Sequence, residues 1–276
     1  KNNLVVDEDN KVKTEESKRI QKENILDNIK ESNIESDAST SNQNEGNNNS
    51  NERFPPNILK VAKASCIINS KDDVKSIGFL VSLPIYMGDT YSFSLYGLLT
   101  TNGILSEEQI KPEKELKLYF YESKQYISYT IQKNSFVFSC PFLDVSFIEI
   151  PFNKIPNVEY LRACEDCTEE QNIYFIKNNN KGDLSLINGN IKYFYGTDIR
   201  YKIDENYKDY PFPGSAVISL STQSDVEIIG ITKEMPLDSE KQYKRATHIS
   251  NIIDAINSLL NHNISSPLDT LSPAKK

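Results

Sequence analysis

The sequence predicts an all-β fold, a barrel or a sandwich, that closes with one C-terminal helix. From residue 57 onward, short apolar runs rich in Val, Ile, Tyr and Phe alternate with polar turns at close spacing, as in proteins built from many short strands. No helix-like apolar pattern interrupts these runs before residue 249. The first 53 residues differ, because they contain no aromatic residue.

The composition limits the function classes that fit this chain. Its 276 residues suffice for one two-barrel domain or two ordinary domains. The net charge of −8 argues against nucleic acid as the main partner, because phosphate binding depends on clustered Lys and Arg. No apolar run approaches the ~20 residues that span a bilayer. The chain begins with Lys, so we expect either a cytoplasmic protein or one secreted after removal of an upstream signal.

Residues 1–55 are predicted to form a disordered, acidic and Asn-rich arm. Glu, Lys, Asn, Asp and Ser dominate it, and residues 41–51 are a low-complexity run. Such a segment buries too little apolar surface to offset its chain entropy. Apolar residues at helix-like spacing between positions 20 and 29 leave a transient helix open as an alternative. The Phe-Pro-Pro sequence at 54–56 marks the boundary with the folded part.

The first half of the folded part is predicted to contain a barrel-sized set of strands. Residues 84–90 are expected to be a turn, and residues 122–125 a hairpin loop. The polar segment from 155 to 170 follows as a connector. The predicted strands cover residues 58–62 and 65–68 (one interrupted strand), 77–83, 93–100, 116–121, 126–131, 136–138 and 145–150.

The second half contains further strands and the closing helix. Asn188-Gly189 is predicted to be a hairpin turn, as is the segment 223–225. Apolar residues at helical spacing predict an amphipathic helix over 249–260, with Thr247 or Ser250 as its N-cap. Residues 263–276 are expected to form a flexible tail. The predicted strands cover residues 173–176, 184–187, 191–195, 216–220 and 226–231.

Three motifs in order resemble the trypsin-like (chymotrypsin-fold) serine peptidases over residues 57–260. The first pairs GFLV, at 78–81, with YGLLTTNGIL, at 96–105. The second is CPFLDVSFIEI, at 140–150, and the third is the PGSAVIS … VEIIGITK block, which begins at Pro213. The resemblance is most specific where all three occur together in this order.

This resemblance implies two antiparallel six-stranded β-barrels with a C-terminal helix. The trypsin-like domain would span 56–262. Its first barrel would cover about 57–155, its linker about 156–170, and its second barrel plus helix about 171–262.

The resemblance also assigns a triad, and one member is missing. In the family, Thr-Thr-Asn is followed by the catalytic histidine, whereas this chain has Gly103 at that position. The role of the carboxylate that orients the histidine falls to Asp144, which could equally cap the turn before its strand. Gly103 and Asp144 are therefore predicted to lie close together in a cleft between the barrels.

The nucleophile turn is also altered, in the segment YPFPGSAVI at 210–218. When the segment is aligned from its C-terminal side, the nucleophile position falls on Gly214, which has no hydroxyl. When it is aligned from its N-terminal side, Ser215 takes the nucleophile position, but the turn is shortened and Pro213 has no N–H for the oxyanion hole. In a related triad system, loss of the nucleophile or base alone costs about 10⁶ in kcat. The sequence therefore predicts an inactive peptidase homologue.

Cys164 and Cys167 form a CxxC pair, for which zinc binding or redox chemistry has to be considered. Zinc would need a second ligand pair, and the only histidines, His248 and His262, lie near the C-terminus. We expect ordinary thiols or one local disulfide, and no cofactor.

Three hypotheses follow from the sequence. The favoured one is an inactive homologue that binds an unidentified protein partner. The first alternative is an active serine peptidase that uses Ser215 with an unusual base, which fluorophosphonate labelling would reveal. The second is a metal or redox module built on Cys164 and Cys167, which bound-metal analysis would test.

Overall fold

Strands dominate the computed structural model of this chain. The structure describes residues 56–69, 75–88, 90–103, 105–121, 125–178, 184–203, 207, 211–220, 226–233 and 243–265. The predicted arm, residues 1–55, lies outside the described residues. The predicted turn at 223–225 and the tail from 266 onward also lie outside them.

The helices and strands of the described part follow the chain in this order. Helix α2 covers Pro56–Ala64, and strands β1 to β7 cover Ser65–Asn69, Lys75–Met87, Thr90–Thr100, Glu115–Phe120, Ile127–Thr130, Val137–Cys140 and Val145–Glu149. Strands β8 to β14 cover Leu161–Ala163, Asn172–Asn178, Leu184–Tyr195, Asp198–Ile203, Ala216–Leu220, Val226–Thr232 and Lys244–His248, and helix α3 covers Ile249–Ser265.

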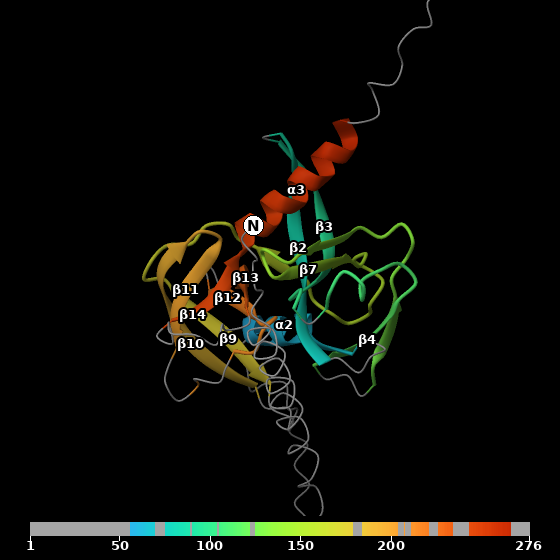
Figure 1. Cartoon of the computed structure of the whole chain (residues 1–276). Helices are drawn as coiled ribbons and strands as arrows, with labels where there is room; N and C mark the ends of the chain where they lie inside the picture. Colours follow the sequence, from blue (N-terminus) through green and yellow to red (C-terminus); the bar gives the residue numbers. More distant parts are fainter. Residues whose placement is uncertain are drawn as a thin grey trace, which may run out of the picture. The chain divides into compact units, whose positions relative to one another are not determined.

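Six strands of the second half form a closed antiparallel barrel (Figure 1). Their order is β12-β9-β10-β11-β14-β13, and the pairing of β13 with β12 closes the ring. The all-β class and one six-stranded barrel are thereby confirmed. Its interior is filled by Ile173, Phe175, Ile187, Ile191, Ile199, Tyr201, Val217, Ile229 and Ala246.

The first half is a row of seven strands in the order β5-β4-β1-β2-β3-β7-β6. Its two end strands, β5 and β6, follow one another in the sequence. No ladder joins these two strands among the described residues. A closed barrel in this half therefore stays a prediction.

Strand β8 joins the two halves into one continuous sheet. It pairs in parallel with β2 through Leu161 and Arg162, and in parallel with β13 through Arg162 and Ala163. The sequence predicts a polar connector without a strand for this segment. A three-residue strand carries too short a pattern to be recognised from the sequence.

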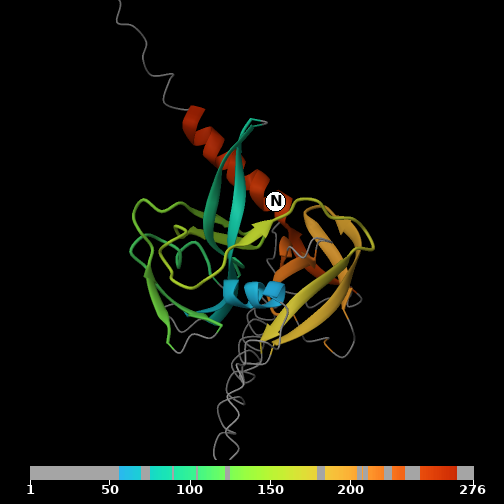
Figure 2. The ribbon, with the colours of Figure 1, turned by 180° about the vertical axis from the view of Figure 1, so that it is seen from behind.

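A second apolar cluster lies between the two halves and includes both helices. Side chains of β2, β3 and β7 meet those of β12 and β13 here, and α2 and α3 contribute Val61, Ile249, Ile252, Ile253 and Ile256. Figure 2 shows α2 lying beside strands of both halves, as its contacts with β1, β4, β9 and β13 indicate. No helix of the described part is long and apolar enough to cross a bilayer.

Helix α3 is confirmed, with different details at both ends. It begins at Ile249, so His248 takes the N-cap position that was predicted for Thr247 or Ser250. The Thr247 hydroxyl instead donates to the Leu143 carbonyl (2.5 Å). The helix reaches Ser265, so the tail predicted from 263 does not begin there.

The first half of the predicted interrupted strand, residues 58–62, is wrong, because this segment lies in helix α2. Pro56 occupies the first helical position, where a missing N–H costs nothing. Asn57 Oδ1 accepts the Ile58 amide (2.9 Å). The buried residues Val61, Ala62 and Ala64 follow helical rather than strand spacing.

The turn predicted over residues 84–90 is also wrong in extent. Strand β2 continues through Pro84 to Met87, and β3 begins at Thr90. Gly88, which follows β2, has a φ of 61°. Pro84 is tolerated because β8, the neighbour on the other edge of β2, pairs no further than Ser82. The result is a long hairpin.

Asn188-Gly189 is not a turn but the middle of the continuous strand β10. Gly189 pairs with Ile173 on one side and Ile203 on the other. A Cβ atom at this position would lie 2.9 Å from the Lys202 carbonyl oxygen. The glycine thus allows two strands to approach closely in the barrel. The turn itself lies at Gly196, where φ is 58°.

Candidate functional site

The predicted site lies where β3 ends, in the turn that carries the Thr-Thr-Asn-Gly sequence. The Leu105 amide donates to the Thr101 carbonyl (3.1 Å) and closes the turn. Asn102 Nδ2 donates to Ser139 Oγ (2.6 Å) and to Ser146 Oγ (3.3 Å). These bonds attach the turn to β6 and β7, so the position of Gly103 is set by neighbouring strands.

The structure brings Gly103 and Asp144 into direct contact. The Gly103 amide donates to Asp144 Oδ1 (2.8 Å), although 41 residues separate them in the sequence. Asp144 lies in the turn between β6 and β7, with φ at 52°, and its own amide donates to the Pro141 carbonyl (3.2 Å). One carboxylate oxygen of Asp144 therefore accepts a hydrogen bond from the main chain at Gly103.

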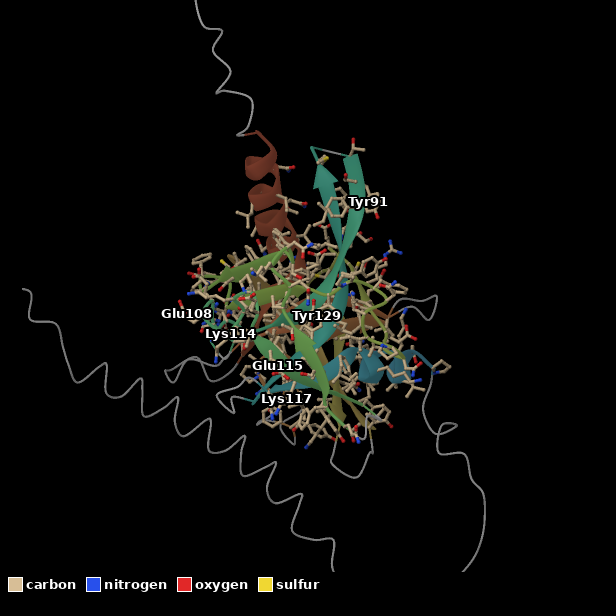
Figure 3. All side chains as sticks on the ribbon, turned by 90° about the vertical axis from the view of Figure 1, so that its right-hand side faces the viewer. Tyr91, Glu108, Lys114, Glu115, Lys117 and Tyr129 are labelled. Carbon is tan, nitrogen blue, oxygen red and sulfur yellow. The ribbon has the colours of Figure 1, made fainter. Side chains whose placement is uncertain are left out.

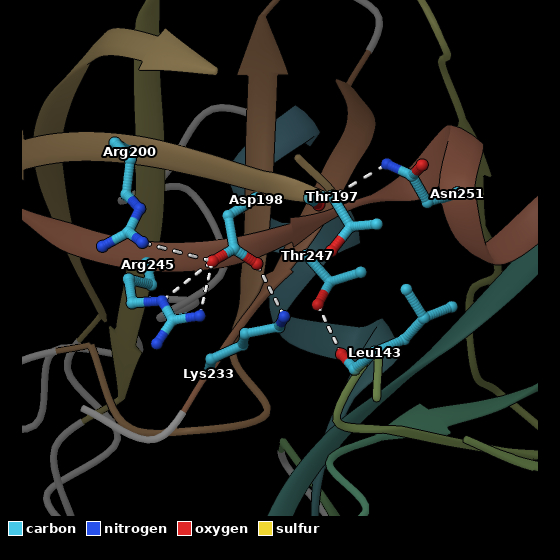
Figure 4. Close-up of polar contacts among 8 residues, drawn as sticks. All are labelled: Leu143, Thr197, Asp198, Arg200, Lys233, Arg245, Thr247 and Asn251. Atoms are coloured by element: carbon cyan, nitrogen blue, oxygen red, sulfur yellow. Dashed lines mark hydrogen bonds and ion pairs between the residues drawn. The ribbon is translucent and has the colours of Figure 1, made fainter. Parts of the chain in front are cut away.

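The Asp144 turn is also attached to the closed barrel. Next to it, the Leu143 carbonyl accepts the hydroxyl of Thr247 on β14 (2.5 Å), as Figure 4 shows. Leu143 and Thr247 are both buried. The Asp144 turn thus lies at the contact between the first group of strands and the closed barrel.

The predicted oxyanion amides are bonded within the protein. Pro213 has no N–H, and the Gly214 amide donates to the Thr232 carbonyl (3.0 Å). The Ser215 amide donates to Thr232 Oγ1 (2.9 Å) and to the Phe212 carbonyl (3.1 Å). An oxyanion needs donors that point into an open site, whereas the Gly214 and Ser215 amides both donate to acceptors within the protein. No sequence pattern predicts that Thr232 accepts these two amides.

Ser215 is only 6% exposed. Its hydroxyl is buried and has no hydrogen-bond partner among the residues that the structure describes. It therefore makes no hydrogen bond to Asp144 or to either ring nitrogen of His248. The structure does not bring the hydroxyl into a nucleophile–base pair.

Gly214 packs against the first group of strands. A Cβ atom there would collide with the carbonyl oxygen of Ile77, and φ is 89°. The same carbonyl accepts the Thr100 hydroxyl (2.8 Å) at the end of β3. The shortened turn thus occupies space beside β2 and β3 rather than facing an open cleft.

The CxxC cysteines lie elsewhere, after β8. Cys167 Sγ lies 2.9 Å from Nε2 of His248, and Cys164 Sγ donates to the Asp166 carbonyl at 3.6 Å. All four cysteines are free thiols. Nowhere in the described ranges do three or more His, Cys, Asp or Glu side chains gather in a way that could hold a metal ion.

The comparisons with known proteins concern only the fold. No protein-family model and no curated protein matches this sequence. Among solved structures, the chain resembles the inactive form of the Rv3671c protease from M. tuberculosis H37Rv as a Ser-to-Ala mutant (TM-score 0.47, 13% identity, 77% of this chain and 93% of that one). It also resembles Deg5 (0.48, 14%, 75% and 93%). A third match is the serine protease of a human pathogenic astrovirus (0.43, 14%, 68% and 90%).

Proposed function

We propose that this protein is a catalytically inactive homologue of the trypsin-like serine peptidases, with two barrels, that binds another protein. The observation that supports catalytic inactivity is the hydrogen bond from the Gly103 amide to Asp144. In a triad, the carboxylate orients an imidazole that takes the proton of the nucleophile. Here the main chain occupies Asp144 Oδ1, and the amides of Gly214 and Ser215 bond to Thr232 and Phe212.

The proposed binding function is supported by exposed apolar side chains on the β2–β3 hairpin. Met87, Tyr91 and Phe93 are 47%, 55% and 43% exposed. Figure 3 shows Tyr91 near the end of this hairpin, beyond the main group of strands. Exposed apolar groups gathered in one place are typical of protein contact sites, and the net charge of −8 favours a protein over a nucleic acid.

The inactive state is tested with a fluorophosphonate probe and an activated ester. We expect no Ser215-dependent labelling and no burst of hydrolysis. Gly103→His should also stay at background, because it supplies a base but no oxyanion donors. Ser215→Ala in both backgrounds is the control. Labelling that disappears in Ser215→Ala would show an active peptidase with an unusual site.

The binding surface is tested by photo-crosslinking from position 91. A photoreactive phenylalanine at Tyr91 should trap a discrete protein, and excess wild-type protein should compete, whereas a Tyr91→Ser, Phe93→Ser variant should not. The matched control places the same group at Tyr126, which is 47% exposed but lies beside β5. Equal trapping from both positions would contradict a site on the hairpin.

A further inference from the structure

Cys167 and His248 form a thiol–imidazole pair away from the Gly103–Asp144 contact. Cys167 lies in the segment after β8, and His248 ends β14. Their Sγ and Nε2 atoms are 2.9 Å apart. On the other side of the ring, Nδ1 is hydrogen-bonded to Ser250 Oγ in the first turn of α3. A nucleophile, a base and a group that orients the base are thus arranged in a row.

The pair is neutral at rest. Burial raises the pKa of the Cys167 thiol to about 12, and the neighbouring Cys164 and Asp166 act in the same direction. Burial lowers the pKa of His248, with Asp254 opposing that change. Near neutral pH the thiol therefore donates to Nε2, and we assign the ring proton to Nδ1, where it donates to Ser250 Oγ.

This arrangement makes Cys167 dependent on His248 for reaction. A thiol with a pKa of about 12 has almost no thiolate at neutral pH, and the thiolate is the nucleophilic form. The imidazole at 2.9 Å can accept the proton while the sulfur attacks, as a general base does. Both residues are only half-buried, and the Phe194 ring stands edge-on to the imidazole, 5.9 Å between centroids.

We propose that Cys167, with His248 as its general base, is a thiol–disulfide exchange site for small disulfides. Cys167 Sγ would attack one sulfur of the disulfide while its proton moves to His248 Nε2. The S–S bond of the disulfide breaks, and its electron pair leaves with the second sulfur as a thiolate. Cys167 then carries a mixed disulfide. The imidazolium returns the proton to solvent or to the departing thiolate.

The other three thiols, including the half-buried Cys140, lack this arrangement. Cys66 is buried, and burial strongly raises its pKa. Cys164 Sγ donates a hydrogen bond to the Asp166 carbonyl. Burial is the main cause that raises the pKa of the Cys164 thiol, and the nearby Glu227 carboxylate raises it further. Among the residues that the structure describes, only Cys167 has a hydrogen bond to a histidine. The site thus rests on one member of the CxxC pair, and its test is independent of peptidase activity.

The test follows release of the coloured thiolate from a dithio-bis-nitrobenzoate reagent by the folded, reduced protein. We expect one rapid equivalent, lost in Cys167→Ser and kept in the matched control Cys164→Ser. His248→Gln should slow the rapid phase at least about tenfold, since general bases contribute roughly 10²–10⁴. Peptide mapping should locate the mixed disulfide on Cys167.

The pH profile of the wild type provides a second test that needs no variant. The rate should fall on acidification as His248 becomes protonated, and stay level from about pH 7 to 8.5. Without the general base, the rate would follow the thiolate fraction and rise steadily over that range, because the pKa of the thiol is about 12. A rate that climbs through pH 8.5 would overturn the proposal. So would a rapid phase that survives in Cys167→Ser or keeps its rate in folded His248→Gln.

Discussion

Asp198→Asn is expected to lower the free energy of unfolding by about 3–5 kcal/mol, because it leaves buried cations without their carboxylate. Asp198 Oδ1 accepts Lys233 Nζ (2.6 Å), and Oδ2 accepts Nε (2.8 Å) and a terminal nitrogen (2.6 Å) of Arg245. Arg200 lies 3.6 Å from the same Oδ2. The Asp198 and Lys233 side chains are only 5% and 7% exposed. Figure 4 shows the cations converging on the one carboxylate.

The matched control for Asp198→Asn is Glu113→Gln, another change of a carboxylate to an amide. Glu113 pairs with Lys133 at 3.2 Å, but the two side chains are 70% and 79% exposed. Solvent screens such a pair, so the midpoint of urea unfolding should barely move. Equal effects of the two substitutions would show that the Asp198 cluster contributes no more than a surface pair.

Gly214→Ala is expected to destabilise the fold by about 2–6 kcal/mol. A φ of 89° costs a non-glycine residue about 1–3 kcal/mol. The added methyl group would also collide with the Ile77 carbonyl oxygen, and overpacking costs about 1–3 kcal/mol more. Urea unfolding, followed by tyrosine fluorescence and circular dichroism, measures the change.

Gly196→Ala is the control for Gly214→Ala. Its φ of 58° is similarly unfavourable for alanine, but no atom lies within 4 Å of the position of a Cβ. The difference between the two variants therefore isolates the contact of Gly214 with β2. If Gly214→Ala cost no more than Gly196→Ala, the turn would be free to move away from Ile77.

Segments with a periodic apolar pattern are those whose secondary structure was predicted correctly from the sequence. The hairpin of β4 and β5 and the helix α3 each have several residues that repeat a clear period, and such segments reveal themselves locally. Gly103 and Asp144 were predicted to meet from the resemblance, and their hydrogen bond joins them. Composition and spacing alone would not have paired two residues that are 41 positions apart.

The errors arose where tertiary contacts decide the conformation. Residues 58–62 are apolar enough for a strand, but α2 forms because its buried face packs against both halves of the chain. Gly189 follows Asn, as in many turns, yet in this chain it allows two neighbouring strands to approach closely. Likewise, the contact of Cys167 with His248, 81 residues later, depends on β8 and β14, which both pair with β13, and no local pattern reveals this.

Strand β8 has a consequence for how the chain reaches this structure. Because it lies between β2 and β13, its own two ladders are complete only when both halves are in place. Both pairings are parallel and join residues that are distant in the sequence, which makes their formation slow. When the protein is stretched or heated, the pairings of Leu161–Ala163 would couple the unfolding of one half to that of the other. We therefore expect a single cooperative unfolding transition, with refolding limited by the docking of this one short strand.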